Sequence, residues 1–451
     1  MTKIRRIDNF QHNFSFTTQV EEFDLFFNRF LEGDLGKIYT AVPWDGLVLG
    51  LGLNDAKKGP RSTFGPQGKI ALMFLKHYAA CSDKRLVEQL NGNIDYQFFC
   101  GINLGADRLT NYKIVSEIRC ELAKKLNIEK VQQTLFDSWR GHMNDHHSIV
   151  MDATCYESEL RYPTNEKLLW ESVDWSYRQL KAICKAVGTK TPRTKYLKWK
   201  KRTISYSKMR RKTKSKRKSL DRSLLLLLAK IDGQLTGLEK QHGLHMPKKY
   251  YRRRATIKRI YEQQHLIFHT GEKPKGRIVS ISKDYLRPIV RGKEVKPVEF
   301  GAKVNKYQID GISFIEHLDF NAFHEGNRFQ YTIFKAQRLT RTKTRLAGAD
   351  AIYATNKNRK FATKYKIGTD FKRKGRAGKH EKQRHQMAAL IQKERATRLE
   401  GSFGKEKEHY YLKKIKARTK QTETLWIFFG IHTANALEIG RRMSSARQKA
   451  A

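Results

Sequence analysis

The sequence predicts a mixed α/β protein, with an all-α N-terminal domain at residues 1–145 and a strand-containing domain at residues 146–440. A basic helical insertion at about 188–269 interrupts the second domain, and residues 441–451 form a basic tail. Three observations predict this organisation: helical spacing of apolar residues before residue 145, short apolar runs from residue 148 onward, and a dense basic stretch between those runs. At roughly 150 residues per domain, a chain of 451 residues accommodates such a plan.

The charge of the chain limits its function more sharply than its length does. The formal net charge is +47, while 39% of the residues are hydrophobic, enough to build a folded core. Such a charge excludes an ordinary small-molecule enzyme and favours a polyanionic partner, nucleic acid above all. The longest run of leucines, residues 224–228, is far short of the ~20 apolar residues of a membrane span, and the N-terminus lacks a secretory signal. Five scattered cysteines without a CxxC pair fit a reducing cytoplasm, where we expect the protein to associate with the nucleoid.

The first 145 residues read as a series of short helices. Apolar residues recur at helical spacing over 68–80, Ser82 is a suitable N-cap for a helix over 83–90, and Thr110 is a suitable cap for a helix with its apolar stripe over 114–126. Short helices in a basic protein fit a DNA-binding helix-turn-helix and a packing or dimerisation domain equally well. The sequence leaves both interpretations open.

Strand signals define the second domain. Residues 148–155 form an apolar run with Asp152 at its end, and further strands are expected over 276–282, 300–309 and 312–318. Asp310-Gly311 lies between the last two runs and predicts a tight hairpin turn. Helix-forming residues without proline fill 381–418. Strands followed by helices predict a mixed α/β domain.

The insertion contains the most basic part of the chain. Residues 190–222 hold 16 Lys or Arg and a single acid, Asp221, with Tyr196, Trp199 and Tyr206 interleaved, and residues 223–241 read as a helix. Basic side chains neutralise phosphates and aromatic rings stack on bases, so DNA contact is favoured over a solvated basic arm. The expected DNA-binding residues here are Arg210, Arg211, Lys212, Lys214, Lys216, Arg217 and Lys218. A second basic loop over 372–376 adds Arg373 and Lys374.

Three acids stand out by their surroundings. Asp152 and Asp350 follow apolar or small residues typical of strands, and Glu400 lies in a basic helical stretch. A carboxylate in such a position is stable when it is paired or bound to a metal ion, and three hard oxygen ligands suit Mg²⁺. Lys407 lies two helical turns after Glu400 and therefore on the same helix face.

Four stretches together resemble the DDE-type transposases of bacterial insertion sequences, which have a ribonuclease H-like catalytic core. The helical first third also resembles the N-terminal domain found in one branch of these enzymes. The stretches are Met151–Thr154 with Glu159–Thr164 and Lys167–Trp170; Arg287–Lys293 with Glu299–Lys303; Gly348–Tyr353 with Asn356–Arg359; and Arg398–Gly404 with Lys407.

The resemblance implies that Asp152, Asp350 and Glu400 form a triad that is both catalytic and metal-binding, with Mg²⁺ (or Mn²⁺) as cofactor. It also implies that Lys407 matches the lysine that related enzymes place after the glutamate. Arg398 is expected to contact DNA. One departure from the family pattern concerns the upstream arginine, because neither Arg395 nor Arg398 has the usual offset and no tyrosine precedes them. Asp370 and Glu394 are the second choices for the second and third acids.

The resemblance implies an enzyme that binds the ends of an insertion sequence, cleaves a strand and transfers the freed 3′-hydroxyl to target DNA. The partners are then double-stranded DNA at the transposon ends and at the target, and a second copy of the chain, since two ends are joined in one event. No membrane and no small-molecule substrate is expected. Two alternatives remain open: a catalytically inactive DNA-binding derivative, and a ribonuclease H-like nuclease that cuts without strand transfer.

Overall fold

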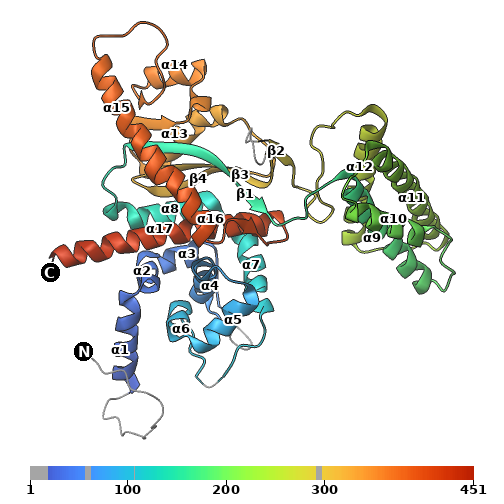
Figure 1. Ribbon diagram of the computed structural model, residues 1–451. Helices are drawn as coiled ribbons and strands as arrows, with labels where there is room; N and C mark the ends of the chain where they lie inside the picture. The colour runs from blue at the N-terminus through green and yellow to red at the C-terminus, as the bar shows by residue number, and fades with distance from the viewer. Residues whose placement is uncertain (1–18, 56–61, 106, 291–296, 451) are drawn as a thin grey trace. The chain divides into compact units, whose positions relative to one another are not determined.

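The computed structural model describes residues 19–55, 62–105, 107–290 and 297–450, and they form a mixed α/β protein that is 62% helical (Figure 1). The chain divides into two compact units. The first consists of Met1–Asp145 together with Phe429–Ala451, and the second of His146–Phe428. Residues 429–440 therefore group with the N-terminal helices. Of the stretch Arg287–Lys293, which is part of the resemblance to transposases, residues 291–293 lie outside the described ranges.

The N-terminal part of the first unit is helical, as predicted. Ser82 caps the fifth helix, where its side chain accepts a hydrogen bond from the backbone N–H of Arg85. The helix expected after Thr110 begins at Lys113 and is preceded by Tyr112, so Thr110 is not its cap. The helices are α1 (Gln19–Glu32), α2 (Asp34–Ala41), α3 (Trp44–Gly50), α4 (Pro66–Ala79), α5 (Asp83–Gly92), α6 (Ile94–Cys100), α7 (Lys113–Lys125) and α8 (Ile128–Trp139), followed by the 3₁₀ turn η1 (Arg140–His142).

The last helix, α17 (Lys420–Ala450), completes the core of this unit from Phe429 onward. The ring of Phe429 packs edge-on against Phe74 of α4, with 5.0 Å between the centroids. At Gly440 a side chain would collide with the backbone of Lys37, because a Cβ there would lie 2.3 Å from its carbonyl oxygen. The N-terminal helices and the last helix thus share one core.

A seven-stranded sheet organises the second unit. Its order is β2-β3-β1-β5-β6, with β4 also paired to β3 and β7 to β1. The central strand β1 runs antiparallel to β3 and parallel to β5. The strands are β1 (Ser148–Ser158), β2 (Pro288–Val290), β3 (Val298–Ile309), β4 (Ile312–Asp319), β5 (Leu346–Ala349), β6 (Gly368–Thr369) and β7 (Lys414–Ile415).

The predicted hairpin is confirmed, and one predicted strand is wrong. Asp310 and Gly311 both have positive φ (45° and 79°), as a two-residue turn between β3 and β4 requires. Residues 276–282 form no strand. Their apolar side chains Ile278 and Ile281 instead pack into the core of the helical insertion, so burial alone explains the apolar pattern.

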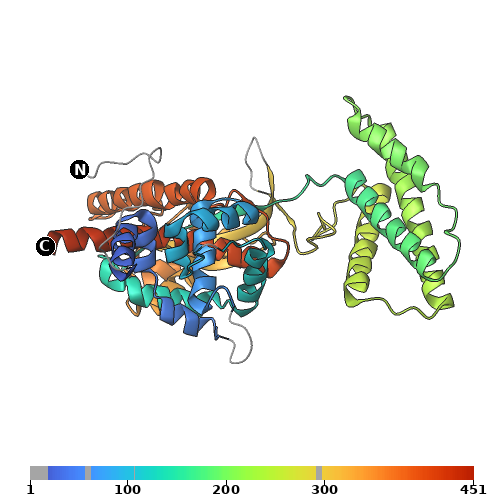
Figure 2. The same ribbon diagram turned by 90° about the horizontal axis from the view of Figure 1, so that it is seen from below.

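The insertion is a cluster of helices with its own core of leucines, isoleucines and tyrosines. Figures 1 and 2 show these helices alongside one another. The longest of them, α11, begins after Thr213, whose hydroxyl caps it by accepting a hydrogen bond from the backbone N–H of Lys216. The helices of this cluster are α9 (Asn165–Ala186), which precedes the stretch 188–269 and shares its core, and α10 (Tyr196–Lys208), α11 (Lys214–Gln241) and α12 (Lys248–Thr270).

Further helices pack around the sheet. Figure 1 shows α15 and α16 crossing the sheet, and the two helices are joined by a five-residue π-helical turn, Arg395–Leu399. Across the described ranges, none of the helices combines the length and apolarity that a membrane span requires. The remaining elements are α13 (Phe329–Thr340), α14 (Asn356–Lys364), α15 (Glu381–Glu394), α16 (Glu400–His409), and the 3₁₀ turns η2 (Glu325–Arg328) and η3 (Ala351–Tyr353).

Candidate active site

Asp152 lies in the middle of β1, not at its end as the sequence suggested, because pairing with β3 carries the strand on to Ser158. Side chains alternate along a strand, so Val150, Asp152 and Thr154 share one face of the sheet. Val150 packs against Leu399 of the π-helical turn, and Thr154 is hydrogen-bonded to Lys407 of α16. The half-buried Asp152 therefore faces the helical segment that carries Glu400. Its Oδ1 accepts a hydrogen bond from the backbone N–H of Ala153 at 2.7 Å.

Asp350 directly follows β5, where its side chain accepts from the backbone N–H of Ala351 and so caps the turn η3. The parallel register pairs Met151 with Ala349. Asp152 and Asp350 are the residues that follow this last pair in their two chain segments. The Asp350 side chain is 60% exposed, so the two acids occupy the solvent-accessible end of the β1–β5 pair.

Glu400 is the first residue of α16 and is exposed. Its neighbours on the helix fix its surroundings: Leu399 is fully buried, and Ser402 accepts a hydrogen bond from Lys306, the residue opposite Asp152 in the β1–β3 register. In the described parts of the chain, no three His, Cys, Asp or Glu side chains gather into a group able to hold a metal ion. Asp152 and Asp350 each follow the last residue pair of the β1–β5 ladder, and in this conformation Glu400 does not form a three-carboxylate group with them.

The donor chemistry nevertheless fits a hard divalent cation. Carboxylate oxygens are the ligands that Mg²⁺ prefers, and it commonly uses one or two carboxylates together with water and substrate phosphate. The exposed Asp350 and the half-buried Asp152 provide such a pair.

Arg395 lies between the two candidate residues for the second acid. Its guanidinium is 3.9 Å from a carboxylate oxygen of Asp350 and 3.7 Å from one of Asp370. Asp370 is buried and accepts a hydrogen bond from the backbone N–H of Ala349, and burial raises the pKa of its carboxyl above the ordinary value. Of the two aspartates, Asp350 is therefore the more accessible to a ligand from solution. The other second choice, Glu394, is paired with Arg398 at 2.9 Å.

The π-helical turn determines where Arg395 points. The backbone N–H of Glu400 bonds to the carbonyl of Arg395, five residues earlier, so the turn contains one more residue than an α-helical turn. In this turn five residues separate the hydrogen-bonded partners Arg395 and Glu400, whereas four residues separate such partners in a regular α-helix. Single π-helical turns of this kind are often found at functional sites.

A buried ionic network behind the acids was not predicted from the sequence. Lys306 and Glu406 are both essentially inaccessible and form an ion pair at 2.5 Å, and Glu406 also accepts from the hydroxyl of Tyr156. Burial raises the pKa of Tyr156 well above its ordinary value, and burial also lowers the pKa of Lys306 against the opposing effect of Glu406. The network joins β1, β3 and α16. The sequence feature that could have pointed to this network is Lys306, a charged residue within the strand expected over 300–309.

Lys407 points toward the sheet on the same side as the acids. Its Nζ donates to the hydroxyl of Thr154 at 3.0 Å and lies 5.8 Å from the centroid of the Tyr156 ring. Thr154 is two residues from Asp152 on the same strand face, so Lys407 contacts the face of β1 that carries Asp152.

The other expected DNA-binding residues are exposed but differ in their partners. Arg398 is paired with Asp310 at 3.1 Å and with Glu394, Arg373 is paired with Glu381 at 3.1 Å, and Lys374 donates to the side chain of Asn356. The insertion cations occupy the loop after α10 and the first turns of α11, and all are exposed: Arg210, Arg211, Lys212, Lys214, Lys216, Arg217 and Lys218.

Comparison with known proteins gives one finding. Residues 32–121 match the model of a family described as Transposase domain (DUF772). The matched segment lies within the helical first unit and supports a transposase-family protein. No curated protein and no solved structure matches the chain.

Proposed function

We propose that this transposase-family protein is a DDE-type enzyme that cleaves the ends of a mobile DNA element and joins them to target DNA. The observation that carries the proposal is the parallel pairing of β1 with β5, because its last pair, Met151 with Ala349, directly precedes Asp152 and Asp350 in the chain. A mixed sheet with one acid on its central strand β1 and another directly after the neighbouring strand β5 also supports a ribonuclease H-like core. The net charge of +47 supports a DNA partner.

Asp152 and Asp350 would hold Mg²⁺ (or Mn²⁺), and Glu400 would complete the site from α16. When bound, the cation supplies an activated water and stabilises charge on the leaving oxygen. Lys407 would hold a phosphate oxygen of the scissile strand near Asp152, because a lysine ammonium acts as a point charge on phosphate.

The reaction would proceed in two substitutions at phosphorus. Water attacks the scissile phosphodiester, the bond from phosphorus to the 3′-oxygen breaks, and a free 3′-hydroxyl and a 5′-phosphate are left. That hydroxyl then attacks a phosphodiester of the target strand and displaces the target's own 3′-oxygen. Because no covalent enzyme intermediate forms, no Ser, Tyr or Cys nucleophile is required. Since two ends are joined, a homodimer on DNA, acting in the cytoplasm at the nucleoid, is part of the proposal.

The test uses the full chain and a labelled duplex taken from the terminal sequence of the element that encodes it, with Mg²⁺ or EDTA. Asp152→Asn, Asp350→Asn and Glu400→Gln should each abolish strand cleavage while end binding stays within about twofold, since losing a metal ligand removes several kcal/mol of transition-state stabilisation. Asp319→Asn is the matched control, because Asp319 lies at the end of β4 and accepts from the backbone N–H of Asn321.

The outcomes separate the alternatives. Cleavage without joining to an added target duplex would indicate a nuclease, and tight end binding without any cleavage would indicate an inactive derivative. If only Asp350→Asn retained cleavage, Asp370 would replace Asp350 as the second acid.

A further inference from the structure

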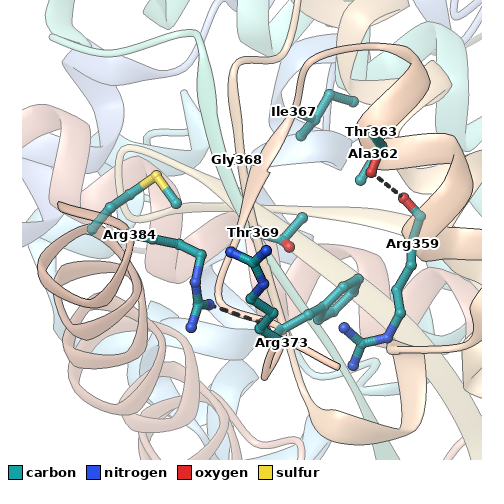
Figure 3. A pocket seen from close by; sticks show the side chains of 10 residues that line it. Arg359, Ala362, Thr363, Ile367, Gly368, Thr369, Arg373 and Arg384 are labelled. Carbon is teal, nitrogen blue, oxygen red and sulfur yellow. Dashed lines mark hydrogen bonds between the residues drawn. The ribbon is translucent and has the colours of Figure 1, made fainter. Parts of the chain in front are cut away.

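We infer that the arginine-lined pocket between α14, β6 and α15 binds one nucleotide of a DNA strand through its phosphate. The inference rests on the proposed function and adds a subsite to it. The pocket has a volume of about 330 Å³. Figure 3 shows the guanidinium groups of Arg359, Arg373 and Arg384 around it.

The lining of the pocket carries an excess of positive charge. Arg373 and Arg384 share a single carboxylate, Glu381, at 3.1 Å from Arg373 and 3.0 Å from the Nε of Arg384. The hydrogen bonds from Arg384 lower the pKa of Glu381 to about 2, so it stays ionised. Arg359 donates to the backbone carbonyls of Ala354 and Lys372. Three guanidiniums therefore line the pocket, and Glu381 is the carboxylate that pairs with two of them. Planar guanidiniums recognise phosphate through paired hydrogen bonds.

The rest of the lining suits the sugar and base of a nucleotide. Ile367, Phe371 and Met387 contribute apolar surface, and Thr363 and Thr369 contribute hydroxyls at the same pocket. The volume of the pocket is at the lower end of the range for small-molecule sites. This volume is larger than a bare phosphate ion needs. A nucleotide uses both parts of the lining, whereas inorganic phosphate uses only the arginines.

The position of the pocket favours a nucleotide within DNA over a free one. Thr369, a lining residue, directly precedes Asp370, and Arg395 connects Asp370 to Asp350. On β6, Thr369 pairs with Ala347 of β5, the strand that Asp350 directly follows. A strand with one phosphate near Asp350 can therefore place a neighbouring nucleotide in the pocket.

The test measures binding of a fluorescent single-stranded 20-mer to the full chain in EDTA, as a function of salt. Each phosphate contact contributes about 0.7 to the slope of log affinity against log salt for single strands. Because the arginines share one phosphate, Arg373→Gln and Arg384→Gln should each reduce the slope by at most about that amount, and Arg384→Lys should restore most of the loss. Arg376→Gln is the matched control, because Arg376 is exposed in the same loop and does not line the pocket. Its slope should equal that of the wild type.

Competition with thymidine monophosphate and with inorganic phosphate distinguishes the sources of the phosphate. The inference predicts that neither compound at millimolar concentration displaces the 20-mer. Displacement by thymidine monophosphate, abolished by Arg384→Gln, would identify a free-nucleotide site and overturn it. The inference would also be overturned if the salt slope were unchanged in Arg373→Gln and Arg384→Gln. The same holds if the control Arg376→Gln reduced the slope as much as they do.

Because binding is measured without metal, failure of the pocket and failure of the proposed chemistry are separable. Asp152→Asn should show the wild-type slope and no cleavage. Arg384→Gln should show a reduced slope whether or not the chain cleaves DNA. Thermal unfolding of Arg384→Gln and Arg384→Lys is compared with that of the wild type. Equal stability shows that a reduced salt slope reflects a lost phosphate contact and not a destabilised fold.

Discussion

The Lys306–Glu406 pair should be among the most sensitive positions in the second unit. Lys306→Met removes one charge and leaves the Glu406 carboxylate, which is 1% exposed, with only the Tyr156 hydroxyl and no cation at 2.5 Å. Removing one partner of a buried pair costs about 3–5 kcal/mol, because the remaining charge stays desolvated. We therefore expect Lys306→Met to lower the free energy of unfolding of the sheet and α16 by that amount.

The double variant tests the reason for this loss. In Lys306→Met/Glu406→Gln no buried charge remains, and the glutamine still accepts from Tyr156. The loss should fall to about 1–2 kcal/mol, which gives a coupling energy of at least about 2 kcal/mol. Lys413→Met is the control, because Lys413 forms an exposed pair with Glu408 and such pairs are worth at most about 1 kcal/mol.

Hydrogen exchange resolved over peptides of α16 and β1 measures the effect locally, which matters because the chain has two units that need not unfold together. Protection in the first unit should not change. Additive losses from the two single substitutions, or a loss below about 1 kcal/mol for Lys306→Met, would refute the view that a desolvated charge pair fixes α16 against the sheet.

Three further predictions concern charge. Lys407→Ala should reduce strand cleavage and loosen contact with the terminal nucleotides without changing the recognised sequence, and Lys407→Arg should be partly tolerated; wild-type cleavage by Lys407→Ala would reject a positioning role. Neutralising the seven exposed insertion cations together should flatten the salt dependence of DNA affinity, measured by anisotropy, and an unchanged slope would place the DNA path elsewhere. Burial, assisted by the nearby Glu166 carboxylate and opposed by Arg217, raises the pKa of Asp221 to about 7. An acid with a raised folded-state pKa is most stabilising when protonated, so unfolding free energy of the insertion should fall as pH rises from about 4 to about 7, by at most about 4 kcal/mol. Asp221→Asn should remove this dependence in urea titrations, and a dependence that persists would contradict the assignment.

Local signals in the sequence predicted local structure well. Ser82 caps α5 because a hydroxyl before a helix satisfies a free backbone N–H, and Asp310-Gly311 forms the hairpin because both residues tolerate positive φ. The apolar run over 276–282 misled for a physical reason: its side chains are buried against helices, and apolar content alone does not distinguish that burial from a strand.

The candidate site was predictable only in part, since its parts are distant in the chain. Asp152 and Asp350 were predicted as site residues from their strand-like surroundings, but the sequence does not show that their segments, β1 and β5, pair in parallel. Lys306 and Glu406 are 100 residues apart, and nothing local links them. The π-helical turn changes the geometry of Arg395 relative to Glu400, and an offset counted along a regular helix cannot show this.

The split composition of the first unit affects how the protein is made. Residues 1–145 emerge from the ribosome long before Phe429, the residue that packs against Phe74. At about 5–20 residues per second, synthesis of the intervening segment takes on the order of 15 to 60 s. During that interval the surface of α4 that later contacts Phe429 of α17 lacks this partner. A chain that terminates before Phe429 would contain all of residues 32–121 and still lack a complete core around them.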